Sequence, residues 1–191
     1  MITKKRLVIF ASGNGSNAET IMRHMASRDH AQVVRIYCNV AQAGVIARAK
    51  SLHVPTLVFD RAGLVDPAVV LSQLHKDSPD LIILAGFLLK IPRCIIEAYP
   101  QHIINIHPAL LPAFGGKGMY GHHVHQAVKD QMAGETGITI HWVNAAYDRG
   151  AIIFQARTQV LASDSVDEIA RKVQVLEQKH FTGVIDEILS A

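Results

Sequence analysis

The order of apolar and polar positions divides the first part of the chain into short apolar runs and longer amphipathic stretches. Short, continuous apolar runs are typical of parallel strands that are buried on both faces, and the stretches between them have helical periodicity. This pattern predicts strands at 7–10, 33–38, 55–59, 80–86 and 102–107, separated by helices at 18–25, 43–52, 66–75 and 92–99. We expect the most apolar run, 80–86, at the centre of the sheet, and the run that begins at Pro55 at an edge.

The pattern changes in the second part of the chain. Residues 113–121 are rich in glycine and predict a loop, which a helix over 122–131 follows. Residues 135–143 alternate polar and apolar, and the short link to a further run at 151–160 predicts an antiparallel pair. A long helix comes last. We therefore expect one α/β domain over 1–191, a single Rossmann-like, open, mainly parallel twisted sheet with helices on both faces and an antiparallel strand extension.

Composition narrows the classes of partner. Of the 191 residues, 49% are hydrophobic and 18% are charged, as in a globular protein, and the net charge of +3 comes without a dense block of Lys and Arg. We therefore expect no nucleic-acid partner, and a small phosphorylated or carboxylated ligand accounts for the mild positive charge. Cys38 and Cys94 are expected to be free thiols. Apolar runs are shorter than the ~20 residues of a membrane span and no signal peptide is recognised, so we expect a cytoplasmic protein without a membrane partner.

The strand at 102–107 ends in Asn105, Ile106 and His107, and Pro108 follows. Proline cannot donate to a sheet ladder and holds the preceding residue extended, so the strand stops there. Asn105 and His107 lie two positions apart and therefore project from the same face. A hydrogen-bond donor and a titratable group at the carboxyl end of a strand predict a reaction site in an open α/β sheet. A strand-end turn with a structural histidine is the alternative.

A glycine-rich turn, 11–17, joins the first strand to the first helix, with Ser16 or Asn17 as the expected N-cap. This arrangement predicts an anion site, because backbone N–H groups and the helix dipole point at the turn. A plain connection is the alternative. The stretch also fits the dinucleotide fingerprint, which needs an acidic residue at the end of the second strand. Asn39 occupies that position, so a nicotinamide cofactor is disfavoured.

Two further segments leave alternatives open. Residues 87–91 continue an apolar run past the central strand, and they either belong to the core or line a pocket for a flat ring system. The stretch that holds His122, His123 and His125 invites a metal site, but this spacing places at most two imidazoles on one helix face. A solvated helix start is the preferred interpretation, and no metal is expected.

Taken together, four motifs carry a family resemblance. They are Gly-Asn-Gly-Ser-Asn at 13–17, Leu-Ala-Gly-Phe at 84–87, Asn-Ile-His-Pro-Ala-Leu-Leu-Pro at 105–112 and Tyr-Asp-Arg-Gly at 147–150. They span nearly the whole chain, which resembles the folate-dependent formyltransferases. The first motif resembles members that act on a phosphorylated ribosyl glycinamide. The resemblance implies transfer of a formyl group from 10-formyltetrahydrofolate to the amine of N1-(5-phospho-D-ribosyl)glycinamide in purine biosynthesis, by a monomer or weak homodimer without a metal.

The same resemblance assigns roles to residues of this chain. It implies that Asn105, His107 and Asp148 are catalytic. The residues implied to bind the ribonucleotide are Gly15, Ser16, Asn17, Ala18, Glu19 and Glu177, and those implied to bind the folate are Leu88, Leu89, Lys90, Ile91, Asn105, Val143 and Arg61. Lys90 stands where family members commonly have arginine, and Arg61 is the candidate for an arginine at the folate tail.

The implied mechanism begins with attack of the amine on the formyl carbon. Asn105 donates to the developing oxyanion, and His107, as imidazolium, protonates the leaving nitrogen. Asp148 is expected to raise the pKa of His107. A formyltetrahydrofolate hydrolase, a methionyl-tRNA formyltransferase, an NAD-dependent oxidoreductase and a non-catalytic binding module are the alternatives. The first two usually carry an additional domain, for which 191 residues leave little room.

Overall fold

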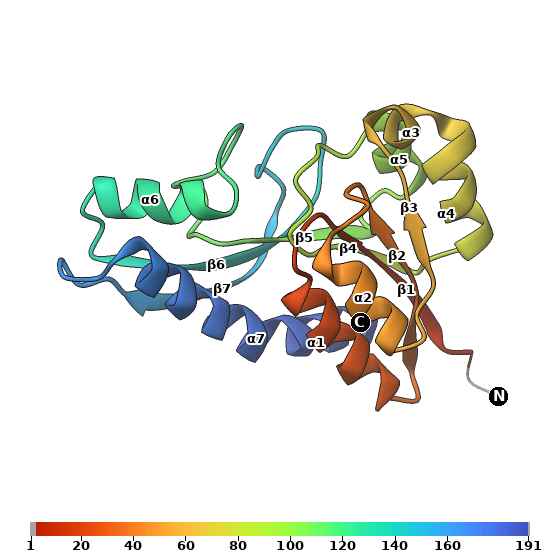
Figure 1. Cartoon of the computed structure of the whole chain (residues 1–191), viewed down its shortest axis with the longest axis horizontal. Helices are drawn as coiled ribbons and strands as arrows, with labels where there is room; N and C mark the ends of the chain where they lie inside the picture. The colour runs from red at the N-terminus through yellow and green to blue at the C-terminus, as the bar shows by residue number, and fades with distance from the viewer. Residues whose placement is uncertain (1–2, 191) are drawn as a thin grey trace. The chain divides into compact units, whose positions relative to one another are not determined.

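The computed structural model describes residues 3–190 (Figure 1). The strands are β1 (Lys5–Ala11), β2 (Ala31–Cys38), β3 (Thr56–Val58), β4 (Leu81–Leu84), β5 (Ile103–His107), β6 (Glu135–Trp142) and β7 (Ile152–Gln159). The helices are α1 (Ser16–Ala26), α2 (Gly44–Ser51), α3 (Arg61–Val65), the π-helix η1 (Pro67–Leu71), α4 (Ser72–Asp77), α5 (Arg93–Ala98), α6 (His122–Asp130) and α7 (Val166–Ser190). The predicted alternation of strand and helix is therefore confirmed.

The strands form one seven-stranded sheet in the order β3-β2-β1-β4-β5-β6-β7. Strand β1 pairs in parallel with β2 and β4, β2 pairs in parallel with β3, and β6 pairs with β7 in the antiparallel sense. The central position of β4 and the edge position of β3 are both confirmed. All four residues of β4 are buried, which is why its sequence is apolar on both faces. The predicted fold class, an open, mainly parallel sheet with an antiparallel extension, is likewise confirmed.

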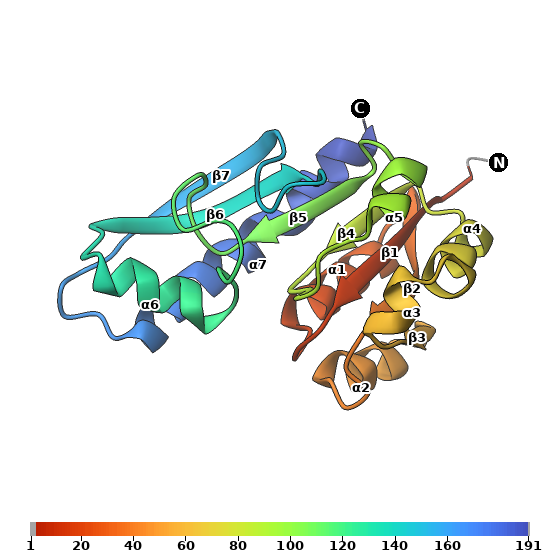
Figure 2. The same ribbon diagram turned by 90° about the horizontal axis from the view of Figure 1, so that it is seen from above.

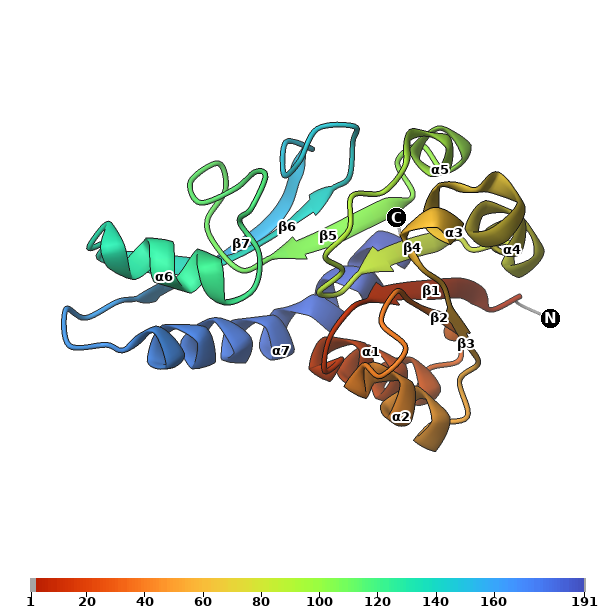
Figure 3. The same cartoon turned by 45° about the horizontal axis from the view of Figure 1, so that its top comes forward.

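Contacts divide the chain into two compact units, and the boundary falls within β5, after Ile104. The expectation of one domain over 1–191 stays a prediction. In the first unit, α1 and α2 lie on one side of the strands and α3, α4 and α5 lie on the other (Figure 3). A cluster of aromatic rings fills its core at the carboxyl ends of the strands, where Phe10 stacks on Tyr37 and meets Phe59 and Phe87 edge-on.

The second unit is built on the long hairpin of β6 and β7 (Figure 2). Helix α7 packs against both strands and also against α6. The apolar side chains between these elements, among them Ile138, Ile140 and Phe181, are almost completely buried. Gly137 allows the two strands to pair closely, because a Cβ atom there would lie 1.9 Å from the carbonyl oxygen of Ala156. No helix within residues 3–190 is both long and apolar enough to cross a membrane.

Local details depart from the predicted elements in the first unit. Helix α1 is capped by Gly15 in the left-handed conformation (φ 78°), whereas the predicted cap was Ser16 or Asn17, and both of these residues lie inside the helix. Asp66 caps a helix as predicted, but the first five residues after it form the π-helix η1, and only then does α4 begin. The short helix α3, capped by the side chain of Asp60, lies in a stretch for which no element was predicted.

Candidate functional site

Strand β5 ends in the expected pair of polar side chains. Ile103, Ile104 and Ile106 of this strand are buried, which anchors it, and Asn105 and His107 project from the same face. Asn105 is half-buried and His107 is only 3% exposed. An imidazole this well buried responds strongly to the few groups that touch it.

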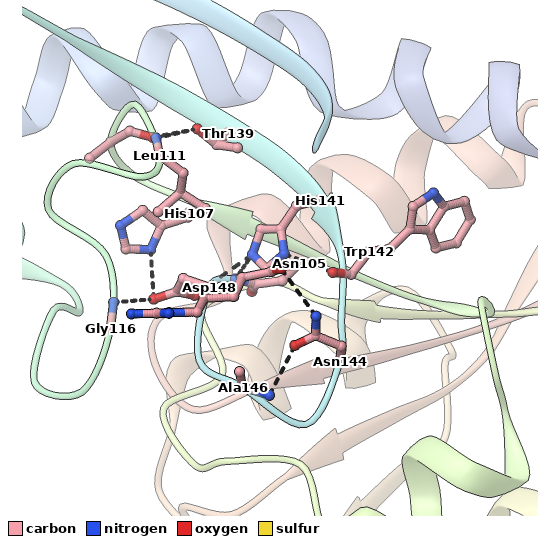
Figure 4. Close-up of polar contacts among 12 residues, drawn as sticks. Asn105, His107, Leu111, Gly116, Thr139, His141, Trp142, Asn144, Ala146 and Asp148 are labelled. Atoms are coloured by element: carbon pink, nitrogen blue, oxygen red, sulfur yellow. Dashed lines mark hydrogen bonds and ion pairs between the residues drawn. The ribbon is translucent and has the colours of Figure 1, made fainter. Parts of the chain in front are cut away.

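Two groups contact the imidazole of His107, and Figure 4 shows one of them, Asp148. Its Nε2 lies 2.8 Å from the carbonyl oxygen of Phe114, and its Nδ1 lies 3.7 Å from Oδ2 of Asp148. A carbonyl oxygen only accepts, so Nε2 carries the hydrogen in this contact. The lone pair of Nδ1 in the neutral ring therefore faces the carboxylate, and a proton taken up at Nδ1 would create an ion pair.

The pKa of His107 departs from the expected direction. Burial of the ring lowers this pKa, and the charge of Asp148 and the hydrogen bond to Phe114 raise it, but burial has the larger effect. The pKa therefore lies below its ordinary value. The expectation that it is raised is wrong, although the effect of Asp148 itself has the expected sign. His107 rests as the neutral imidazole near neutral pH.

Asp148 lies in the turn between β6 and β7, with its backbone in the left-handed region (φ 51°). The backbone N–H of Gly116, in the glycine-rich loop, donates to its Oδ2 at 2.9 Å. Burial acts to raise the pKa of Asp148, but its contacts with His141, Gly116 and His107 outweigh burial, and the pKa lies below its ordinary value. The carboxylate is therefore charged, and the loop is attached to it by its backbone.

His141, on β6, connects Asn105 to Asp148, and it was not among the predicted site residues. Its Nδ1 lies 2.9 Å from the carbonyl oxygen of Trp142, so Nδ1 carries the hydrogen in the neutral ring. Its Nε2 then accepts from the side-chain amide of Asn105 at 3.1 Å, and it lies 3.7 Å from Oδ1 of Asp148. The sequence signal was a titratable residue at the end of a strand, just before the turn that holds Asp148.

The hydroxyl of Thr139 fixes the segment that follows His107. It donates to the carbonyl oxygen of Ala109 at 2.7 Å and accepts from the backbone N–H of Leu111 at 2.9 Å. Gln155 of β7 donates both to this hydroxyl, at 2.9 Å, and to the carbonyl oxygen of Leu111, at 3.0 Å. Side chains from both β6 and β7 therefore hold residues 109–111, the segment that follows Asn105 and His107.

A cavity of about 490 Å³ opens beside Asp148 in the second unit. Its size lies within the range that is typical of small-molecule sites. It is lined by Leu111, Pro112, Gly115, Gly116, Tyr147, Asp148, Arg149, Gly150 and Ile152. The carboxylate that contacts His107 is therefore accessible from a space large enough for part of a ligand.

The glycine-rich turn of the first unit leads directly into the start of α1, as the sequence predicted. The anion site at this helix start stays a prediction. Residues 16–19 lie in the first turn of this helix, directly after Gly15. A Cβ atom at Gly15 would lie 2.5 Å from Cβ of Val45, so the turn is packed against the start of α2. Glu19 accepts hydrogen bonds from Arg23 and Arg48, and Arg48 also donates to the backbone of Asn14 at 2.8 Å.

Ser12 connects the ends of three strands in the first unit. Its hydroxyl donates to Oδ1 of Asn39 at 2.6 Å and accepts from the backbone N–H of Leu88 at 2.9 Å. Asn39 stands where a dinucleotide site needs an acidic residue, and its side-chain oxygen is already used as an acceptor by Ser12. This arrangement gives no support to a nicotinamide site.

The remaining predicted residues are placed as follows. In the segment after β4, Leu88 and Lys90 are exposed, Leu89 is half-buried and Ile91 is buried. Arg61 is exposed at the start of α3, Val143 is half-buried just after β6, and Glu177 is half-buried on α7. Within residues 3–190, no group of three or more His, Cys, Asp or Glu side chains is arranged to hold a metal ion.

The comparisons with known proteins agree on one family. Residues 5–185 match the Formyl transferase family. The chain is 41% identical to the chloroplastic phosphoribosylglycinamide formyltransferase of Arabidopsis thaliana over 97% of its length, and 35% identical to that of Bacillus subtilis, also over 97%. It spans 95% of the Bacillus relative but only 65% of the Arabidopsis relative. A crystal structure of phosphoribosylglycinamide formyltransferase from Anaplasma phagocytophilum has a TM-score of 0.90 at 28% identity, and the match covers 98% of this chain and 88% of that one.

Proposed function

Because the chain belongs to the Formyl transferase family, we propose that it transfers the formyl group of 10-formyltetrahydrofolate to the amine of N1-(5-phospho-D-ribosyl)glycinamide. The products are the N-formyl ribonucleotide and tetrahydrofolate, and the reaction belongs to purine biosynthesis. The observation that carries this proposal is the direct contact of Asp148 with His107, beside Asn105, at the end of β5.

Asn105 is proposed to stabilise the oxyanion that forms when the amine attacks the formyl carbon. One N–H of its side-chain amide is directed at His141, and the second is available to the oxyanion. Holding the amide in one orientation before the reaction is what gives such a donor its effect, which is typically ~10²–10³ in rate.

His107 is proposed to act first as a base and then as an acid. Because burial keeps its imidazole neutral, Nδ1 accepts the proton that the attacking amine loses in the tetrahedral intermediate, relayed by a water molecule that the carboxylate of Asp148 would hold beside it. The same proton then passes to the leaving N10 of the folate, and the C–N10 bond breaks. Asp148 stabilises the imidazolium that exists between the two transfers, because its carboxylate faces Nδ1 at 3.7 Å.

The binding roles follow from the position of each group. The start of α1, from Gly15 to Glu19, is proposed to bind the phosphate at the helix N-terminus, which favours an anion through its backbone and not through the carboxylate of Glu19. Residues 88–91, together with Val143, are proposed to contact the pterin, with Arg61 at the folate tail and Glu177 at the amino end of the ribonucleotide. A monomeric or weakly dimeric state and a cytoplasmic location stay predictions.

A hydrolase of 10-formyltetrahydrofolate is the second candidate, because the same three groups would activate a water molecule in place of the amine. A single assay separates the two. The protein is incubated with 10-formyltetrahydrofolate, with and without the ribonucleotide, and the deformylated folate is followed by absorbance. Turnover that requires the ribonucleotide supports the proposal. Turnover that is independent of it supports the hydrolase, and the lack of turnover in both samples contradicts both activities.

A further inference from the structure

We propose that Arg48 is a positioning residue of the phosphate-binding turn, where it holds Asn14 in place and offsets the charge of Glu19. The turn then accepts a doubly charged phosphate. This inference rests on the proposed function, in which the start of α1 binds the phosphate of the acceptor, and it extends that function to a residue of α2.

Glu19 creates an electrostatic problem for such a site. It lies in the first turn of α1, and an acidic residue there stabilises the helix but repels an anion at the same helix end. Hydrogen bonds from Arg23 and Arg48 keep its pKa below the ordinary value, so the carboxylate stays charged. Protonation therefore does not remove the repulsion, and a nearby cation has to offset it.

Both arginines touch this carboxylate, but they come from different elements. Arg23 is one helical turn away on α1, at 2.7 Å, and its side chain is 61% exposed. Arg48 comes from α2 and is less exposed, at 34%. Charges closer to the protein interior are screened less by salt and water, so Arg48 is expected to have the larger effect on a bound anion.

Arg48 alone of the two also holds the turn itself. Its Nε donates to the carbonyl oxygen of Asn14 at 2.8 Å, and its Nη2 donates to Oδ1 of Asn14 at 3.2 Å. Gly44 makes this approach possible, because a Cβ atom there would lie 2.7 Å from Oδ1 of Asn14. The backbone N–H of Val45 donates to the carbonyl oxygen of Gly13 at 3.2 Å. The start of α2 thus supports the turn, and Arg48 adds the charge.

The first test is Arg48→Gln in steady-state kinetics. We expect the KM for the ribonucleotide to rise about 10- to 100-fold, because Glu19 then keeps only the more exposed Arg23 as its partner and Asn14 loses the two hydrogen bonds from Arg48. The kcat and the KM for 10-formyltetrahydrofolate should stay within about threefold, because the variant leaves the reacting groups of β5 unchanged. With the phosphate-free ribosyl glycinamide, kcat/KM should be equal in the variant and the wild type. A general loss of structure would instead lower kcat/KM for the ribonucleotide and for the phosphate-free substrate together.

Two variants serve as controls. Arg23→Gln removes a partner from the same carboxylate without touching Asn14, and its KM should change by less than about threefold. Adding Glu19→Gln to Arg48→Gln should recover part of the lost affinity, because the repelling charge is gone. An unchanged KM in Arg48→Gln, an equal loss with the phosphate-free substrate, or no recovery in the double variant would overturn the inference.

A binding measurement separates this inference from the proposed activity. Inorganic phosphate should raise the melting temperature of the wild type and of Arg23→Gln, and it should do so much less for Arg48→Gln. If the wild type transfers no formyl group but shows this pattern, the proposed function fails and the role of Arg48 stands. Equal stabilisation of all three proteins, or none in the wild type, overturns the role of Arg48.

Discussion

Replacing Asp148 by asparagine tests whether its charge, and not only its hydrogen bond, supports His107. The amide oxygen of asparagine can still accept from the N–H of Gly116, so the glycine-rich loop keeps its attachment. The side chains of His107 and Asp148 are only 4% and 13% exposed, and the two atoms that face each other are 3.7 Å apart. Solvent therefore screens the pair weakly.

The size of the effect follows from that distance. At an effective dielectric constant of ~20, two unit charges at this separation attract by on the order of 4 kcal/mol, which corresponds to roughly 10³ in a rate that depends on the imidazolium. We therefore expect kcat of Asp148→Asn to fall by about 10²–10³. Because Asp148 raises the pKa of His107, its loss should lower that pKa further, so the imidazolium forms only at more acidic pH.

The assay is kcat as a function of pH, together with an NMR titration of the His107 imidazole. Asp130→Asn, which removes an exposed carboxylate at the end of α6, is the matched control and should behave as the wild type. If Asp148→Asn keeps the wild-type kcat and pH profile, Asp148 does not stabilise a charged His107. If kcat falls while the imidazole titrates unchanged, the carboxylate acts on another group.

Three predictions concern stability. Asp77→Ala should lower the free energy of unfolding by about 3–5 kcal/mol in urea titrations, because the buried carboxylate accepts hydrogen bonds from Arg35 and from Tyr37. Tyr37→Phe removes only one of these bonds and should cost about 1 kcal/mol. Similar losses in the two variants would contradict this role of Asp77. Gly15→Ala should cost about 1–3 kcal/mol, because of its positive φ and the close Val45, while Gly13→Ala, which meets nothing within 4 Å, serves as the control and should cost less than about 1 kcal/mol. Burial lowers the pKa of His125 to about 4, so below pH ~6.5 the unfolded chain binds a proton that the folded chain binds only near pH 4. The free energy of unfolding should therefore fall by on the order of 3 kcal/mol as the pH drops from ~6.5 to about 4. His125→Leu should remove that part of the pH dependence, and an unchanged dependence would refute the assignment.

The sequence predicted features of the fold that depend on local pattern. An uninterrupted apolar run identified β4 as central, because a strand buried on both faces needs no polar alternation. Pro55 indicated the edge strand, since proline removes a donor that a central strand would use. The cap of α1 was misplaced by one or two positions, because the close approach of Val45, which requires a glycine at position 15, comes from a segment far along the chain.

The same distinction applies to the candidate site. Asn105 and His107 were recognisable because Pro108 marks a strand end. His141 was not recognised, because its contact with Asn105 depends on the pairing of β6 with the rest of the sheet and not on local spacing. The sign of the His107 pKa shift was also missed. A neighbouring charge can be inferred from a motif, whereas the extent of burial depends on the packed structure.

The left-handed backbone conformation of Asp148 limits which residues this position tolerates. At φ 51°, aspartate, asparagine and glycine are tolerated, whereas glutamate would keep the negative charge only at the cost of backbone strain. Exchanging one acid for the other is therefore not conservative at this position. A single base change converts an aspartate codon into an asparagine codon, so a substitution that keeps the shape of the turn and removes its charge is readily accessible. A chain with asparagine here should therefore fold normally while it loses most of its activity.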